Sequence, residues 1–128
     1  MSVLNGVYVD VNNTIYVRCG DSGTVIITGI PTDDNYHVSL GVYNPLSKEI
    51  ITETSSNSNS QETVTLDISV SMTETIGVGT YFYAIKLCHG SDEQTVLPKA
   101  TIDSEGVLQR PLAPNFIVSP KLVEGSQE

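Results

Sequence analysis

The stretch that decides the fold is Gly79-Thr80-Tyr81-Phe82-Tyr83-Ala84-Ile85-Lys86-Leu87. Every second residue in it is large and suited to a buried face, namely Tyr81, Tyr83, Ile85 and Leu87. Residues two apart in a β-strand point to the same side, so these four form one apolar wall. The residues between them, with Cys88 after them, make the mixed face of a half-covered sheet. The stretch predicts a strand of an all-β domain and carries no chemistry of its own.

Other segments combine β-branched or aromatic residues with alternating polarity, and turn residues separate them. We expect strands at residues 14–18, 24–30, 36–43, 48–53, 63–70, 94–102 and 115–118. Seven or eight strands at this regular spacing predict a two-sheet antiparallel β-sandwich. No stretch of ten residues shows an apolar stripe at helical spacing, so we expect little or no helix.

Particular segments carry finer expectations. The β-branched run at residues 24–30 predicts a strand buried on both faces. Residues 54–61, almost wholly Ser and Asn, predict a mobile hairpin tip or loop. We expect a short irregular crossing at residues 71–78 and a loop at residues 103–114.

The length of 128 residues fits a single domain. We place the sandwich at residues 14–120. Residues 1–13 are polar and weakly patterned, and we expect an arm or a short edge strand there. Residues 121–128 are expected to be a C-terminal tail, frayed at residues 124–128.

The charge of the chain limits its partners. Fifteen acidic and six basic residues give a net charge of −9, which argues against nucleic acid and against an anionic membrane surface. No apolar run approaches the roughly 20 residues that span a bilayer. Cations and basic partners remain compatible with this charge. The first six residues lack the basic region and apolar core of a signal peptide, so we expect synthesis in a cytoplasm without export by the usual route.

The two cysteines, Cys19 and Cys88, are expected to be free thiols in a reducing compartment. In antibody domains the second cysteine follows the corner tyrosine by two residues, and a tryptophan lies between the pair. Here Cys88 comes seven residues after Tyr81, and the chain has no Trp.

The order of these features resembles the small immunoglobulin-like domain at the N-terminus of bacteriophage baseplate upper proteins and related tail or head appendage proteins. The residues that carry the resemblance are the Gly20-Asp21 turn before a β-branched strand, the Gly79-x-Tyr81-x-Tyr83 strand and the closing Phe116-x-Val118-x-Pro120. The resemblance covers roughly residues 14–120 and implies an immunoglobulin-like sandwich that assembles as a trimer or hexamer. The 103–114 loop is longer than the compact turn of that family.

The histidines and acidic pairs are weak candidates for a site. A structural zinc needs four ligands in compact spacing, whereas His89 has only Cys88 beside it and His37 stands alone, so solvent-facing histidines are expected. Calcium between loops would use acidic pairs such as Asp33-Asp34 and Asp92-Glu93. Neither pair has the calcium-loop spacing, so solvated turns are expected.

No catalytic group is predicted. Ser91, with His89 and Asp92 beside it, supplies the residue types of a hydrolytic triad. Three residues of one turn cannot orient one another as nucleophile, base and orienting acid. We therefore expect no catalytic, cofactor or metal site and predict that the protein is not an enzyme.

The aromatic residues offer a carbohydrate-stacking platform as an alternative. Its candidates are Tyr8, Tyr16, Tyr43, Phe82 and Tyr83. Such platforms commonly use tryptophan, and a sandwich absorbs aromatic residues in its core, so protein–protein contact is the favoured role.

Two functional hypotheses follow. The first is a non-enzymatic phage or prophage-encoded structural protein, a baseplate, tail or head appendage component that contacts other virion proteins or copies of itself through its edges and chain ends. It would be made in the bacterial host cytoplasm and reside in the virion, with no cofactor, nucleic acid or membrane insertion. The alternative is a carbohydrate- or cell-surface-binding module of an adhesin, with a host surface glycan as its ligand; a small enzyme ranks third.

Overall fold

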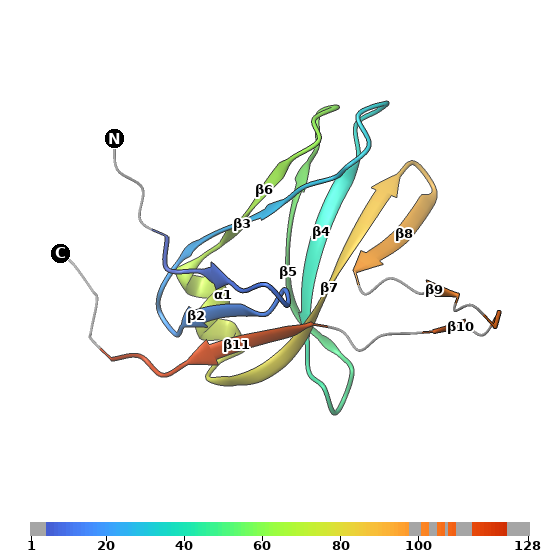
Figure 1. Ribbon diagram of the computed structural model, residues 1–128. Helices are drawn as coiled ribbons and strands as arrows, with labels where there is room; N and C mark the ends of the chain where they lie inside the picture. Colours follow the sequence, from blue (N-terminus) through green and yellow to red (C-terminus); the bar gives the residue numbers. More distant parts are fainter. Residues whose placement is uncertain (1–4, 98–100, 103–104, 107, 110–113, 123–128) are drawn as a thin grey trace.

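The computed structural model describes residues 5–97, 101–102, 105–106, 108–109 and 114–122 (Figure 1). These residues form mostly strands, with one short helix between the sixth and seventh strands. The elements in chain order are β1 Tyr8–Val9, β2 Ile15–Arg18, β3 Gly23–Ile27, β4 His37–Tyr43, β5 Ile50–Asn57, β6 Val64–Ile68, α1 Val70–Ile76, β7 Gly79–His89, β8 Asp92–Leu97, β9 Thr101–Ile102, β10 Leu108–Gln109 and β11 Asn115–Ser119.

Two sheets make the body of the fold. The larger has the order β1-β2-β11-β7-β4-β5, with β8 also paired to β7, and the smaller consists of β3 and β6. β9 and β10 form a separate two-stranded pair. The prediction of an all-β sandwich of two sheets is confirmed. One pairing departs from the predicted antiparallel arrangement: β11 lies parallel to β2, which the long connection between them permits.

The core lies between the inward faces of the two sheets. The alternation predicted for β7 is confirmed, since Tyr83 and Ile85 are buried and Tyr81 and Leu87 are half-buried. Apolar side chains of both sheets surround them, and those that are essentially inaccessible include Ile15, Val38, Leu40, Val42, Leu66, Ile68 and Phe116.

One edge of β7 is shared by two strands. β8 pairs with Ile85–His89, whereas β11 pairs with Gly79–Phe82. The chain therefore leaves this edge after Leu97 and returns at Asn115. The strand expected at residues 94–102 ends in the large sheet at Leu97, and Thr101–Ile102 pair with Leu108–Gln109 instead. The 103–114 segment expected as a loop thus contains β10 within the residues described.

Three finer expectations are wrong. β3 is not buried on both faces, because it belongs to a two-stranded sheet whose outer face is open, and Ile26 is 61% exposed. β5 continues to Asn57 through the predicted mobile loop, since it pairs with β4 along its whole length. Residues 70–76 form α1 in place of an irregular crossing, because the Ser69 side chain caps it by accepting from the Met72 N–H at 3.0 Å.

The segment expected as an arm or a short edge strand contains the edge strand. β1 pairs with β2 through Tyr8↔Tyr16 and Val9↔Ile15. Val7, just before β1, is only 8% exposed and belongs to the core. Residues 5–9 are therefore an integral part of the sandwich.

A corner tyrosine fixes the start of β7. The Tyr81 hydroxyl donates to the Ile76 carbonyl at the end of α1, at 2.8 Å. Its ring lies over Gly79, where a Cβ would come within 3.1–3.3 Å of the ring atoms and where φ is +154°. Glycine is favoured at this position because L residues rarely adopt this φ and because a Cβ would press on the tyrosine side chain.

Candidate functional site

The sandwich is closed along one side. The Thr54 hydroxyl of β5 donates to the Asp67 carbonyl of β6 at 2.8 Å and links the two sheets there. On the other side the described pairings leave β3 bonded only to β6 and β8 only to β7. The two sheets thus present unpaired edges to each other, and these strands stand apart on the two sides of β4 in Figure 1.

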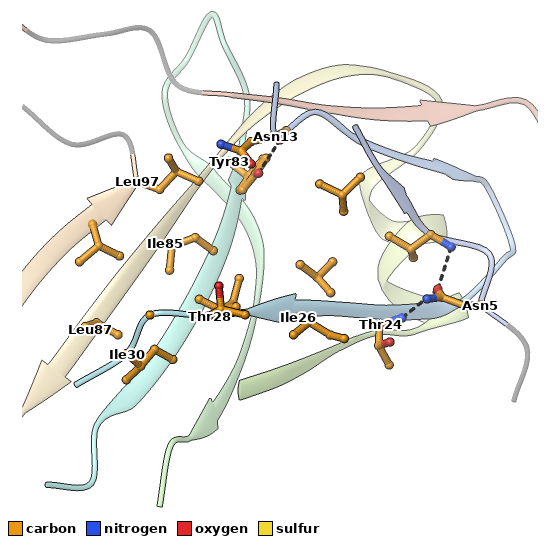
Figure 2. Close-up of a pocket in the computed structure, with 16 residues that line it drawn as sticks. Asn5, Asn13, Thr24, Ile26, Thr28, Ile30, Tyr83, Ile85, Leu87 and Leu97 are labelled. Atoms are coloured by element: carbon orange, nitrogen blue, oxygen red, sulfur yellow. Dashed lines mark hydrogen bonds between the residues drawn. The ribbon is translucent and has the colours of Figure 1, made fainter. Parts of the chain in front are cut away.

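An apolar groove of about 580 Å³ lies along this open side (Figure 2). The inward side chains of β7 form its floor, including Ile85 and Leu87. Residues 24–30 form one wall, and Val96 and Leu97 of β8 form part of the other. The groove is also lined by Asn5, Val7, Val9, Asn13 and Tyr83. None of these lining residues is charged, in a chain with twenty-one charged residues, so an apolar occupant suits the groove.

The backbone of β3 offers hydrogen-bonding groups to the groove. At its start, the Ser22 carbonyl accepts from Gly6 N–H at 2.8 Å and Thr24 N–H donates to Asn5 Oδ1 at 3.2 Å. The backbone groups of successive strand residues point to opposite sides, so Ile26 and Thr28 face the same edge as Thr24. No backbone bond joins this edge beyond Thr24 to another described residue.

Tyr83 closes one end of the groove. Its hydroxyl donates to the Asn13 carbonyl at 2.5 Å, and its ring meets Phe116 edge-on at 6.4 Å. Burial, with a smaller contribution from the negative charge of Asp10, raises the pKa of Tyr83 to about 12. The phenol is therefore a fixed, neutral donor with a structural role.

Acidic side chains surround the other end. Leu87 also lines a second hollow of about 420 Å³, together with Pro31, Tyr36, His89, Asp92, Glu93 and Gln94. Asp34 contacts His89 at 2.9 Å, and Glu93 pairs with Lys86 at 2.9 Å. The Asn35 N–H, and then His89, lower the pKa of Asp34, while Lys86 lowers that of Glu93. Asp33 and Asp92 add to these two carboxylates, and Lys86 and His89 are the only basic side chains beside them among the described contacts, so this end of the groove is acidic.

The histidines and acidic pairs lie at the surface. His37 contacts Asn57 Oδ1 at 3.2 Å on the outward face of β4, in the same cross-strand row as Cys88 and Glu93. The Tyr36 hydroxyl donates to Asp33 at 2.9 Å, and its ring lies 5.4 Å from that of His89. Within the described ranges, no three His, Cys, Asp or Glu side chains gather as a metal-ligand group. Ser91 is exposed in the turn between β7 and β8.

The five candidate aromatic residues separate into two sets. Tyr83 is in the core, whereas the other four share the outer face of the large sheet. Tyr8 and Tyr16 pair across strands with ring centroids 6.0 Å apart, and Tyr43 and Phe82 do so at 5.9 Å. The register places the outward residue Ile117 of β11 beside Tyr16, between the two pairs. The outer face thus carries an aromatic patch made of Tyr8, Tyr16, Tyr43 and Phe82.

Cys19 and Cys88 are both free and half-buried. Cys19 N–H bonds the Ser119 carbonyl, next to the start of β7, whereas Cys88 is near the end of that strand. The length of β7 separates them by about 30 Å, far beyond the reach of a disulfide.

The groove is the feature that sequence reasoning missed. Its signal is the run Thr24-Val25-Ile26-Ile27-Thr28, which contains no charge and no proline. Strands at an exposed edge ordinarily carry a charged residue or a proline, which prevents another strand from pairing there. The absence of both from this run indicates an edge that is available for pairing.

In the part of the chain that the structure describes, no helix is long and apolar enough to cross a membrane. No protein-family model matches the chain, and a search of curated proteins gave no match to it.

Proposed function

We propose that this protein is a non-enzymatic structural component of a phage or prophage-encoded particle, part of its baseplate, tail or head appendage, and that it acts by binding neighbouring proteins. The observation that carries the proposal is the uncharged groove beside an unpaired strand edge. An unpaired edge next to apolar pockets is the arrangement that proteins use to accept a strand from another chain.

The topology supports an immunoglobulin-like classification, on which the resemblance to phage appendage domains depends. A corner tyrosine near the start of a central strand, bonded to backbone just upstream, is a hallmark of such sandwiches. Tyr81 makes this bond to Ile76. The order β11-β7-β4 in one sheet, facing β3-β6 in the other, agrees with strands G, F and C facing B and E.

The experiment is to locate the protein in particles. Phage particles are induced from the source bacterium, purified on a density gradient and labelled with an antibody against this chain for electron microscopy. The proposal predicts label at one fixed position on each particle. Protein that stays entirely in the particle-free lysate would overturn it.

A second candidate function is glycan binding on the outer face of the large sheet. The observation that favours it is the aromatic patch, where Tyr8 and Tyr16 are 64% and 36% exposed. Two aromatic pairs on one face of the sheet can stack on sugar rings, as an adhesin module would require. Isolated protein on a glycan array should then bind, and Tyr8→Ala with Tyr16→Ala should abolish the signal. Binding by neither protein would exclude this function while leaving the assembly role intact.

A further inference from the structure

The β3 edge of the groove has a set of backbone groups with which an added strand can pair. By the alternation along β3, these are the carbonyl of Thr24, both groups of Ile26 and the N–H of Thr28. At one end of this stretch the Thr24 N–H already donates to Asn5 Oδ1. At the other end Gly29, with φ of +80°, turns the backbone away. The free edge is therefore short and well delimited.

The side chains beside this edge leave room for apolar groups. Ile27, Leu87, Val96 and Leu97 pack against the core but are only partly buried, and all four line the groove. A strand added next to β3 points every second side chain toward them. We expect those side chains to be apolar, because the four side chains that they meet carry no polar group to satisfy a buried polar one.

The charged side chains of the protein around the groove indicate which residue type suits the end of an added strand. The groove itself is uncharged, but Asp34 and Asp92 stand around the hollow that shares Leu87 at one end. A basic residue at that end of an apolar segment matches this distribution. A second copy of the chain brings its own charge of −9, and repulsion between copies disfavours it as the occupant.

We propose that the groove between β3 and β8 binds an extended segment of a different particle protein, with alternating apolar residues and a Lys or Arg at the end beside Leu87, as an added strand paired with Ile26. This inference rests on the proposed function and specifies the partner of the same site. The partner contributes backbone hydrogen bonds to β3 and apolar side chains to the floor formed by β7.

The probe is a nine-residue synthetic peptide of alternating valine and threonine with a lysine at each end. Its controls are a peptide of the same composition with the valines grouped together, and one with glutamate in place of each lysine. Fluorescence anisotropy with the full-length protein should show saturable binding of the probe. Each control should bind at least tenfold more weakly, and added salt should weaken the binding of the lysine peptide.

Two variants test the edge, and a third is their matched control. Ile26→Pro removes the N–H that faces the groove and spares the β3–β6 ladder, as edge strands tolerate. Ile26→Lys adds a charge to the edge. Ile50→Lys, on the edge strand β5, changes a side chain of nearly the same exposure, 60% against 61%. We expect at least a tenfold loss of peptide affinity in both Ile26 variants and less than a twofold change in Ile50→Lys.

If Ile26→Pro fails to fold, amide hydrogen exchange on the wild-type protein tests whether the peptide pairs with β3. The bound peptide should slow exchange at Ile26 and Thr28. Absent binding, or binding that is equal in wild type and Ile26→Lys, overturns the inference. Wild-type self-association that Ile26→Lys abolishes, without peptide binding, would assign the groove to a second copy and overturn it as well. Particle labelling is independent of all these outcomes, so the proposed function can stand if this inference fails.

Discussion

Tyr81 ties α1 to β7 through one hydroxyl. Tyr81→Phe removes the bond to the Ile76 carbonyl and should cost about 1 kcal/mol of unfolding free energy. Tyr81→Ala also removes the ring that packs over Gly79 and should cost about 3 kcal/mol, the low end for aromatic truncations because Tyr81 is only half-buried. Urea unfolding measures both. A loss below about 1 kcal/mol for Tyr81→Ala would show that the corner contributes little.

Tyr83 makes the stability depend on alkaline pH. Its folded-state pKa of about 12 lies above the ordinary value of 10, so the neutral phenol is favoured by folding. That stabilisation is complete below pH 10 and is lost as the pH rises toward 12. A pKa that rises from 10 to about 12 corresponds to roughly 2–3 kcal/mol of stabilisation.

Tyr83→Phe should therefore lose less stability than wild type between pH 10 and 12, although it is less stable at neutral pH because it lacks the bond to Asn13. Urea unfolding at several pH values measures the two slopes. Tyr16, Tyr36 and Tyr43, whose pKa values are also raised, are present in both proteins and so do not affect the comparison. If the free energy of unfolding changes with pH in the same way in both proteins, the raised pKa does not belong to Tyr83.

At the scale of elements, alternation predicted β2, β4, β6, β7 and β11 well. Prediction from alternation failed where contacts between distant parts of the chain hold a segment whose own residues do not favour a strand. The Ser- and Asn-rich end of β5 is a strand because it pairs with β4, and Ser58 beyond it is buried because it exchanges hydrogen bonds with Tyr36. Residues of low β-propensity can be held in this way by tertiary bonds that a local pattern does not contain.

The segment before β2 offers a matched pair of substitutions. Val7 is 8% exposed and lies in the core, whereas Val11 is 98% exposed. Val7→Ala should cost about 2 kcal/mol, from two lost methylene equivalents and the cavity they leave. Val11→Ala should change stability by less than about 0.5 kcal/mol. Equal effects in thermal or urea unfolding would mean that these residues form a detached arm.

The two cysteines lie near opposite ends of β7. After unfolding under non-reducing conditions, both Cys19 and Cys88 should react with a thiol reagent, giving two labels per chain by mass spectrometry. A protein that yields no free thiol would contain a disulfide, and the placement of β2 relative to β7 would then be wrong.

At the scale of the whole molecule, composition and strand spacing sufficed to predict a two-sheet sandwich, but not which side of it is open. Strand periodicity tells which side chains face inward and says nothing of which edges pair. The parallel contact of β2 with β11 joins residues about a hundred positions apart. The division of one edge of β7 between β8 and β11 likewise depends on a strand that returns from further along the chain. The groove is a product of those pairings, and so the local sequence could not reveal it.

The free edge of β3 is the central claim, and amide hydrogen exchange of the protein alone tests it most directly. Measured by NMR at a concentration where light scattering shows a single chain, Val25 and Ile27 should exchange slowly, because their N–H groups face β6. Ile26 and Thr28, which face the groove, should exchange much faster. Equally slow exchange at all four residues would show that the edge is already covered and would contradict the account.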